Sequence, residues 1–289
     1  MLFQKMEEHD LRIVVMKILH ITDIHLVTSG QKLCGLDPEK RFMACIKDIN
    51  AHHSDADFCV ITGDLADKGE ITAYRLLKRC LAELTVPYHL VIGNHDVRTN
   101  YLEVFQDAES DSYGFIQSSM KTKGGLFLFL DTKQDGTHEG AYCDLRRSWL
   151  DDQLNSAGDT PVYLFMHHPP FQTGLPSMDR IGLRDREQLF DLVRMYNNIQ
   201  HIFCGHLHRP ISGSWAKIPV TTLRGTNHQV ALDFESFDHL YGNFEPPTYG
   251  VALLENNSVV VHFHDYQDNS ELFDMGDPIA FEEFCTVDE

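Results

Sequence analysis

The chain has 289 residues, of which 43% are hydrophobic, and this supplies enough apolar side chain for a large α/β core without disulfide or metal staples. It carries 24 Lys and Arg against 43 Asp and Glu, a formal net charge of −19. Because so acidic a surface repels polyanions, the charge argues against long nucleic acid as a partner, whereas a small anionic substrate is still compatible where bound divalent ions reverse the local field.

Residues 1–15 lack the features of a secretory signal. The run MLFQKMEEHDLRIVV is acidic and mixed, whereas a signal needs a basic start and a long apolar stretch. No later apolar run approaches the roughly 18 residues of a membrane span, and the seven cysteines form no Cys-x-x-Cys pair. The sequence therefore predicts a cytoplasmic protein with reduced thiols, an N-terminal extension over residues 1–15 and no membrane partner.

From residue 17 onward, short β-rich runs alternate with helical patterns, which is typical of βαβ units. The predicted strands cover residues 17–22, 58–62, 88–92, 126–131, 162–166 and 201–204. The predicted helices cover residues 38–51, 72–84, 144–155 and 184–196. Several of the strands are uninterrupted apolar runs, which suits strands buried on both faces. These elements predict one main α/β domain over residues 16–225.

The composition changes after Gly225, where polar and aromatic segments lead to a predicted hairpin. Its strands cover residues 250–254 and 259–263, joined by a turn at Asn256-Asn257. We expect residues 226–289 to form a C-terminal cap, with the hairpin as an appendage to the main sheet. The acidic end, residues 281–289, is predicted to be a solvated tail.

Five short polar clusters lie at the ends of predicted strands. They are Asp23-Ile24-His25, Gly63-Asp64, Gly93-Asn94-His95-Asp96, His167-His168 and Gly205-His206-Leu207-His208. Because open α/β sheets build their ligand sites at the carboxyl ends of strands, these residues are predicted to converge in one crevice although they lie far apart in the chain.

The clusters combine carboxylates, imidazoles and an amide, a set that suits Mn²⁺, Fe or Zn²⁺ better than Ca²⁺ or a thiolate-seeking ion. Asp23 and His25 are two residues apart at a strand end, so a local kink would turn both toward one ion. Glycine precedes Asp64, Asn94 and His206, where it permits sharp turns and close backbone approach.

Each cluster alone is a weak signal, because an isolated histidine is more often packed than a ligand and Gly-Asp is an ordinary turn. What favours a metal site is their joint occurrence in order. Among the other histidines, His20 is predicted to be core, His168 to line the cleft and His228 to reach the site from the C-terminal segment. His138-Glu139 does not complete a His-Glu-x-x-His zinc motif.

Taken together, the five clusters resemble the calcineurin-like metallophosphoesterase superfamily over roughly residues 17 to 225. The block His167-His168-Pro169-Pro170 and the segment 225–229 are most similar to bacterial class III cyclic nucleotide phosphodiesterases and related glycerophosphodiesterases. The resemblance implies a four-layer α/β/β/α sandwich. Residues 226–289, which include the C-terminal hairpin, would form a small extension of it.

The resemblance also implies roles for single residues. Two metal ions are expected, and Asp64 would bridge them. The first ion would be held by Asp23, His25, Asp64 and His208, and the second by Asp64, Asn94, His167 and His206. His95 is expected to act as the acid beside the leaving oxygen, and Asn94, His95 and His168 to bind substrate. Asp96 would either orient His95 or cap the turn.

The implied reaction is hydrolysis of small phosphodiesters by a metal-bridging hydroxide. The leading substrates are 3',5'-cyclic nucleotides; the alternatives are glycerophosphodiesters or a broad specificity that includes monoesters, and, more distantly, a non-catalytic scaffold. The stretch from Pro169 to Leu183, with Phe171 and Met178, is predicted to receive the leaving group. Four arginines are candidates for phosphate contact or for surface ion pairs: Arg98, Arg180, Arg184 and Arg209. The C-terminal region is expected to cap the cleft or to form a homo-oligomer, a dimer or higher.

Overall fold

The computed structural model describes residues 16–255, 258–272 and 274. The predicted N-terminal extension, the Asn256-Asn257 turn and the acidic end at residues 281–289 lie outside the described residues. Among the described residues, no helix is both long enough and apolar enough to cross a membrane.

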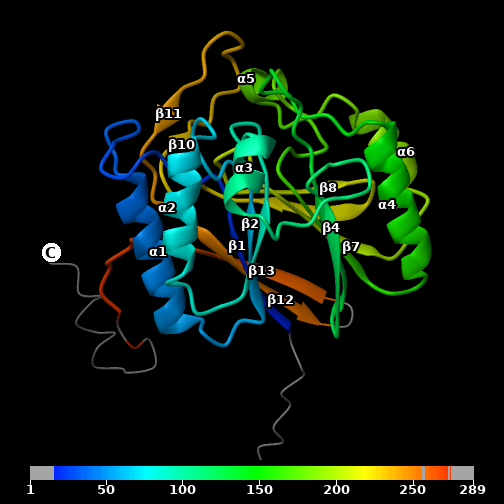
Figure 1. Cartoon of the computed structure of the whole chain (residues 1–289), viewed down its shortest axis with the longest axis horizontal. Coiled ribbons are helices and arrows are strands. Elements are labelled where there is room, and N and C mark those ends of the chain that lie inside the picture. The colour runs from blue at the N-terminus through cyan, green and yellow to red at the C-terminus, as the bar shows by residue number, and fades with distance from the viewer. Residues whose placement is uncertain (1–15, 256–257, 273, 275–289) are drawn as a thin grey trace, which may run out of the picture.

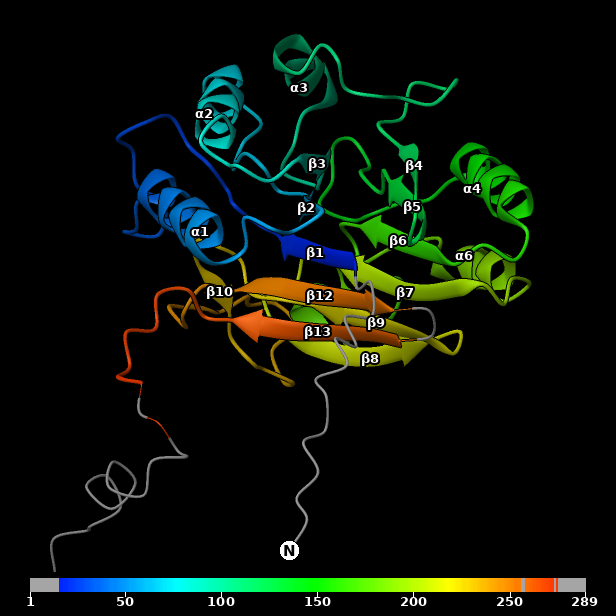
Figure 2. The ribbon, with the colours of Figure 1, turned by 90° about the horizontal axis from the view of Figure 1, so that it is seen from below.

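Two β-sheets form the centre of the molecule (Figure 2). The first sheet has the order β13-β12-β1-β2-β3 and contains β1 (Met16–Ile21), β2 (Phe58–Thr62), β3 (Tyr88–Val91), β12 (Tyr249–Glu255) and β13 (Ser258–His264). The second has the order β4-β5-β6-β7-β9-β8 and contains β4 (Ser118–Thr122), β5 (Gly125–Leu130), β6 (Val162–Met166), β7 (Ile199–Cys204), β8 (Ile211–Trp215) and β9 (Ile218–Thr222). In the first sheet β1, β2 and β3 run parallel, and in the second β5, β6 and β7 do, as βαβ units require.

The inner faces of the two sheets pack against each other through an apolar cluster. Aromatic rings dominate its middle: Phe165 stacks on Phe203 with ring centroids 4.6 Å apart, and Phe127 stacks on Tyr163 at 4.9 Å. Such rings bury a large apolar area each. Strands β2, β6 and β7 are therefore buried on both faces, as their uninterrupted apolar runs predicted.

Helices cover the two outer faces (Figure 1). The first sheet is covered by α1 (Pro38–His52), α2 (Ile71–Leu81) and α3 (Arg98–Val104), and the second by α4 (Asp144–Ala157) and α6 (Arg186–Val193). Helix α1 begins where the sequence encodes a start: the Asp37 carboxylate accepts a hydrogen bond from Lys40 N at 3.1 Å, and Pro38 occupies the first turn. The predicted four-layer α/β/β/α sandwich is confirmed.

The C-terminal hairpin differs from the prediction. Residues 250–254 of strand β12 pair antiparallel with residues 16–20 of β1, so the hairpin belongs to the main sheet and the prediction of an appendage was wrong. The reason is burial: Tyr249, Val251 and Leu254 are at most 7% exposed. Residues 226–248 form an arm with two short strands, β10 (Gln229–Val230) and β11 (Gly242–Asn243). The division of the chain at residue 225 stays a prediction.

Candidate metal centre

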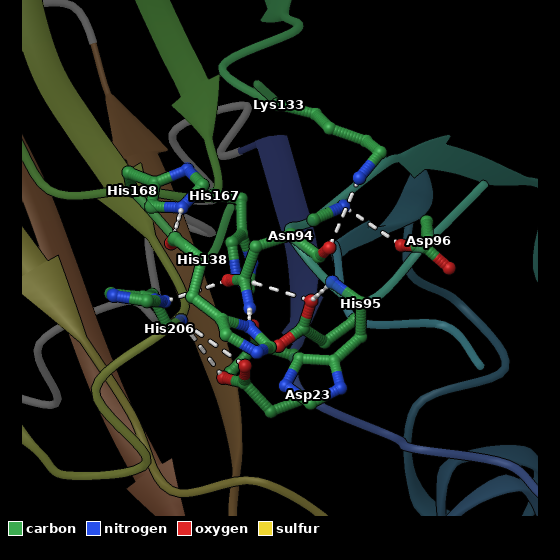
Figure 3. Close-up of polar contacts among 12 residues, drawn as sticks. Asp23, Asn94, His95, Asp96, Lys133, His138, His167, His168 and His206 are labelled. Atoms are coloured by element: carbon green, nitrogen blue, oxygen red, sulfur yellow. Dashed lines mark hydrogen bonds and ion pairs between the residues drawn. The ribbon is translucent and has the colours of Figure 1, made fainter. Parts of the chain in front are cut away.

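The carboxyl ends of five parallel strands meet at one edge of the sandwich, and seven polar side chains lie there. Asp23 and His25 follow β1, Asp64 follows β2, Asn94 follows β3, His167 follows β6, and His206 and His208 follow β7. All seven are at most 7% exposed. The structure thus brings together every side chain predicted to hold a metal, and Figure 3 shows four of them, Asp23, Asn94, His167 and His206.

The backbone at this edge is strained. Eight non-glycine residues in the described part of the chain have a left-handed φ, and five of them belong to the seven. These five are Asp23, His25, Asp64, His206 and His208, with φ between 46° and 70°. Such conformations cost on the order of 1–3 kcal/mol each and cluster at functional sites. They provide the kinks that the sequence predicted for the Asp23/His25 pair.

Glycines permit the close approach of the strand ends. Gly63 has φ +92°, and a Cβ atom there would lie 2.5 Å from His167 Nδ1. A Cβ atom on Gly205 would lie 2.0 Å from Thr22 Oγ1. Neither position has room for a side chain, so the role predicted for these glycines is confirmed.

Four of the side chains surround one point. Ligand atoms of Asp23, His25, Asp64 and His208 all lie within 4.8 Å of one another. His25 Nε2 and His208 Nε2 are 3.1 Å apart, and His208 Nε2 lies 3.5 Å from Asp23 Oδ1. His208 Nδ1 donates to the His228 carbonyl at 2.7 Å, which leaves the Nε2 lone pair free for a cation.

Three further ligand atoms converge on a second point. Asn94 Oδ1 lies 3.0 Å from His167 Nε2 and 2.9 Å from His206 Nδ1. His167 Nδ1 donates to the Thr62 carbonyl at 2.7 Å, so its Nε2 is also free for a cation.

Asp64 lies between the two groups. Its Oδ2 is 3.5 Å from His25 Nε2 in the first group, and its Oδ1 is 3.4 Å from His167 Nε2 in the second. One carboxylate oxygen thus faces each group, which is the geometry of a bridging ligand.

The chemistry of this set fits two cations. Burial alone would raise the pKa of Asp64, yet nearby His167 and His95 hold it well below the usual value. The pKa of His167 is raised to about 9, against its burial, by Asp64. His206 Nε2, by contrast, is buried and has no hydrogen-bond partner among the described residues. Buried carboxylates and imidazoles that share protons in this way exchange them for divalent ions.

The family model described as calcineurin-like phosphoesterase matches residues 16–210. The chain belongs to the calcineurin-like phosphoesterase family. It is therefore a metallophosphoesterase, and members of this family of hydrolases use a dimetal centre.

Relatives of this metallophosphoesterase are named as diesterases. A protein of Rhodopseudomonas palustris named a probable cyclic nucleotide phosphodiesterase is 38% identical, over 92% of this chain and 98% of its own. The glycerophosphodiester phosphodiesterase of Enterobacter lignolyticus is 29% identical, over 95% and 98%. Among solved structures, a dimetal phosphatase from Danio rerio has a TM-score of 0.64 at 15% identity, covering 87% of this chain and 96% of its own, which supports the fold.

His95 and Asp96 have distinct environments in this metallophosphoesterase. His95 Nδ1 donates to the Asp67 carbonyl at 2.6 Å, so its Nε2 is the nitrogen left for a substrate. The Asp96 carboxylate accepts hydrogen bonds from Gly93 N at 2.7 Å and Tyr74 Oη at 2.9 Å, and from two further backbone amides. Of the two roles considered for Asp96, the structure therefore supports the cap on the turn.

The remaining histidines divide into core and cavity. His20 is fully buried, with Nε2 2.7 Å from Thr62 Oγ1, as predicted for a core residue. His168 differs from the prediction: it is fully buried, both ring nitrogens contact protein atoms, and it does not line the cavity. His228 does line the cavity, with its ring centroid 4.7 Å from that of His208.

Three residues at the site were not predicted. Asp67 Oδ1 lies 3.4 Å from His25 Nδ1, Lys133 Nζ donates to the Asn94 carbonyl at 3.1 Å, and His138 Nδ1 is 2.9 Å from Asn94 Nδ2. Lys133 and His138 belong to the loop after β5, a strand whose carboxyl end received no cluster in the sequence analysis. Their position just after a predicted strand was the signal in the sequence that could have identified Lys133 and His138 as site residues.

A cavity of about 300 Å³ opens above the candidate metal ligands. Its apolar wall consists of Leu33, Met178, Ile181, Val230 and Leu240. Met178 matches the predicted wall, whereas Phe171 lines a different surface pocket and that part of the prediction was wrong.

Among the described residues, no lysine or arginine lines this cavity. The four candidate arginines are engaged elsewhere: Arg98 with Asp131 and Asp135, Arg184 with Glu139, and Arg209 with Glu245, while Arg180 lies over the Phe237 ring. Of the two roles considered, the structure supports ion pairs for Arg98, Arg184 and Arg209, whereas Arg180 contacts an aromatic ring.

Proposed function

We propose that this metallophosphoesterase hydrolyses small phosphodiesters, with 3',5'-cyclic nucleotides as the leading substrates. The two ions would be held by the seven ligands as two groups of four that share Asp64. The observation that carries the proposal is the cavity, which joins a polar floor to an apolar wall and has no lysine or arginine in its lining. A diester has one negative charge fewer than a monoester dianion, so it needs no cation beyond the metals.

The apolar wall also bears on the leaving group. A nucleoside offers an aromatic base that such a wall can cover, whereas glycerol offers only hydroxyl groups, which would find few partners there. The relative from Rhodopseudomonas palustris named for cyclic nucleotides agrees with this choice. Glycerophosphodiesters are the closest rival, since the relative from Enterobacter lignolyticus is named for them.

In the proposed mechanism, the bound metals activate water and neutralise charge on the phosphate. The residues of the chain hold the ions and act on the leaving oxygen. Asp64 would hold both ions, because one of its carboxylate oxygens faces each group of ligands. His95 donates from Nδ1 to the Asp67 carbonyl, and in its doubly protonated form it would donate a hydrogen bond or a proton from Nε2 to the leaving oxygen.

We further propose Mn, Fe or Zn as the metals, since the mixed oxygen and nitrogen ligands accept each of them. A cytoplasmic location is supported by the six described cysteines, all of which are free. Because all seven candidate metal ligands are present, we rank a non-catalytic scaffold last among the alternatives.

A homo-oligomer formed through the C-terminal arm is part of the proposal. The arm exposes six large apolar side chains, an apolar surface suited to self-association: Leu232, Phe234, Phe237, Leu240, Tyr241 and Phe244. Sedimentation velocity tests this: Phe244→Ser should shift the protein toward monomer, and a wild-type monomer at all concentrations would contradict it.

A substrate panel tests the proposed function. Metal-depleted protein would be reloaded with Mn²⁺, Fe²⁺ or Zn²⁺ and given cyclic nucleotides, glycerophosphodiesters, a bis-aryl phosphate and a mono-aryl phosphate. We expect kcat/KM to be highest for cyclic nucleotides and far higher for the bis-aryl than for the mono-aryl ester. A preference for the mono-aryl ester would overturn the diesterase assignment, and a preference for glycerol diesters would replace the leading substrate.

A further inference from the structure

Asn94 differs from the other six candidate ligands in having two unlike ends on one group. Its amide presents an oxygen or, after rotation by half a turn, an NH₂ group of almost the same shape. Only the oxygen can bind a cation. Occupation of the second site therefore depends on which end of this amide faces His167 and His206.

One contact decides between the two ends. Asn94 Nδ2 lies 2.9 Å from His138 Nδ1, while Asn94 Oδ1 lies 3.0 Å from His167 Nε2 (Figure 3). Because an amide nitrogen can only donate, His138 Nδ1 accepts this hydrogen bond and its ring carries a proton on Nε2. In the rotated amide, Oδ1 would face the Nδ1 lone pair of His138, an arrangement that this tautomer disfavours.

His138 is itself held in place by the chain beneath it. Its carbonyl accepts a hydrogen bond from His168 Nε2 at 3.1 Å, and His168 Nδ1 is 2.8 Å from Thr132 Oγ1. A Cβ atom on Gly140 would lie 2.5 Å from His168 Cγ, so the loop presses closely on that ring. This gives the buried His168 a structural role: it supports the loop that carries His138.

The backbone of Asn94 is braced from the same loop. Lys133 is buried and donates to the Asn94 carbonyl at 3.1 Å. The Lys133 carbonyl in turn accepts from Arg98 at 2.6 Å and from Arg146 at 3.0 Å, and Arg146 is fully buried. Since these contacts fix the main chain of Asn94, rotation of its side-chain amide is the freedom that remains.

We propose that His138 is a positioning residue, which turns the Asn94 oxygen toward the second ion and thereby sets how tightly that ion binds. The inference rests on the ligand set of the proposed function, but not on the choice of substrate. Substitutions of residues that orient metal ligands typically weaken metal binding by about 10- to 100-fold. We expect an effect of this size on the second ion and little effect on the first.

The experiment titrates metal-depleted protein with Mn²⁺ and measures bound metal by equilibrium dialysis and calorimetry. Wild-type protein should bind two ions. His138→Leu should bind the first ion normally and the second about 10- to 100-fold more weakly. His138→Asn keeps an acceptor oxygen near the position of Nδ1 and should restore much of the affinity. Gln134→Leu, on the same loop, is the matched control and should behave as wild type.

A double substitution separates positioning from general loosening of the loop. Asn94→Asp offers an oxygen at both ends, so rotation no longer matters, and His138→Leu should then weaken the second ion no further. The proposal would be overturned if His138→Leu lowered the affinity for the second ion equally with and without Asn94→Asp. It would also be overturned if His138→Leu weakened the binding of both ions equally. If wild-type protein binds fewer than two ions, the ligand set itself fails, which is a distinct result.

Discussion

Asp64 is the residue on which both groups of candidate ligands depend, because its two oxygens face different groups. We predict that Asp64→Ala lowers kcat on a diester substrate by about 10³-fold or more, since the bridge and the stabilisation supplied by the paired ions are lost together. Steady-state kinetics with metal analysis would check this. Near-normal turnover in the variant would refute the two-ion mechanism.

His201 provides a prediction on pH and stability. It is 4% exposed, its Nε2 lies 2.9 Å from Thr221 Oγ1, and burial lowers its pKa from 6.5 to about 4. Because the folded-state pKa is below the unfolded one, the full stability is present above about pH 6.5. It is lost as the pH falls toward 4, by up to about 3 kcal/mol.

His201→Gln keeps a hydrogen-bonding group near Thr221 but does not titrate in this range. We therefore expect it to flatten the fall in the free energy of unfolding between pH 6.5 and 4, measured by urea denaturation of metal-depleted protein. His52→Gln is the control, because the His52 side chain is 64% exposed. Identical pH slopes for wild type and His201→Gln would contradict the prediction.

At the level of residues, the sequence predicted the seven clustered ligand candidates because their types and their places at strand ends can be read locally. Asp67, Lys133 and His138 were missed for the opposite reason. Their roles arise from contacts with Asn94, His25 and His95 that span 28 to 44 positions of the chain. The placement of His168 in the cleft was wrong for a similar reason, since its partners Thr132 and His138 come from another loop.

Among the structural elements, the turn after β2 is tightly packed. A Cβ atom on Gly63 would meet His167 Nδ1 at 2.5 Å and Gly93 N at 2.8 Å. We predict that Gly63→Ala destabilises the protein by about 3 kcal/mol, from strain and overpacking together, and displaces His167. Thermal and urea unfolding measure the first effect, and Mn²⁺ binding the second.

Gly30 is the matched control for this substitution. Its φ of +82° is close to the +92° of Gly63, but nothing lies within 4 Å of a Cβ atom there. Gly30→Ala should therefore cost only the backbone strain, about 1 kcal/mol, and leave metal binding unchanged. Equal costs at the two positions would mean that crowding at the strand end is unimportant.

The β12–β13 hairpin supplies the next prediction. A chain ending at Gly225 leaves β1 without its antiparallel partner and removes buried Tyr249, Val251 and Leu254 from the core. We expect this truncated chain to show no cooperative thermal unfolding by circular dichroism. A chain ending at Ser270 retains every described helix and strand and should unfold like the full-length protein; similar melting of both truncated chains would contradict the prediction.

The order of long helices and buried strands was predictable, because amphipathic periodicity and apolar runs are local signals. Short elements were missed, among them α3 and the strands β4, β8 and β9. The hairpin was predicted as a pair of strands but placed wrongly. An apolar run such as residues 249–254 reads the same at an edge or inside a sheet, and its partner β1 lies more than two hundred positions away.

For the molecule as a whole, metal binding should be a major source of stability. The ligand candidates come from the ends of five strands in two sheets, so two bound ions would join both sheets at one edge. An ion at about 100 times its Kd contributes about 2.7 kcal/mol. Two such ions should raise the unfolding midpoint by about 10 °C or more.

Differential scanning calorimetry of metal-depleted and Mn²⁺-reloaded protein measures this shift. Asp64→Ala should show only a small part of it, because it lacks the bridging carboxylate. Equal midpoints with and without metal in the wild-type protein would mean that the site adds nothing to the stability of the fold.

Strand β1 lies between its two partners β2 and β12, and β12 is the later of these two in the sequence. During synthesis, β1 leaves the ribosome before the other described strands and must therefore wait for residues 249–255 before its sheet is complete. Until then its antiparallel edge is open, and neighbouring nascent chains could pair with it. Folding of this protein should therefore be late and slow relative to its synthesis. Expression at lower temperature should raise the soluble fraction, because the β12–β13 hairpin then has time to pair with β1.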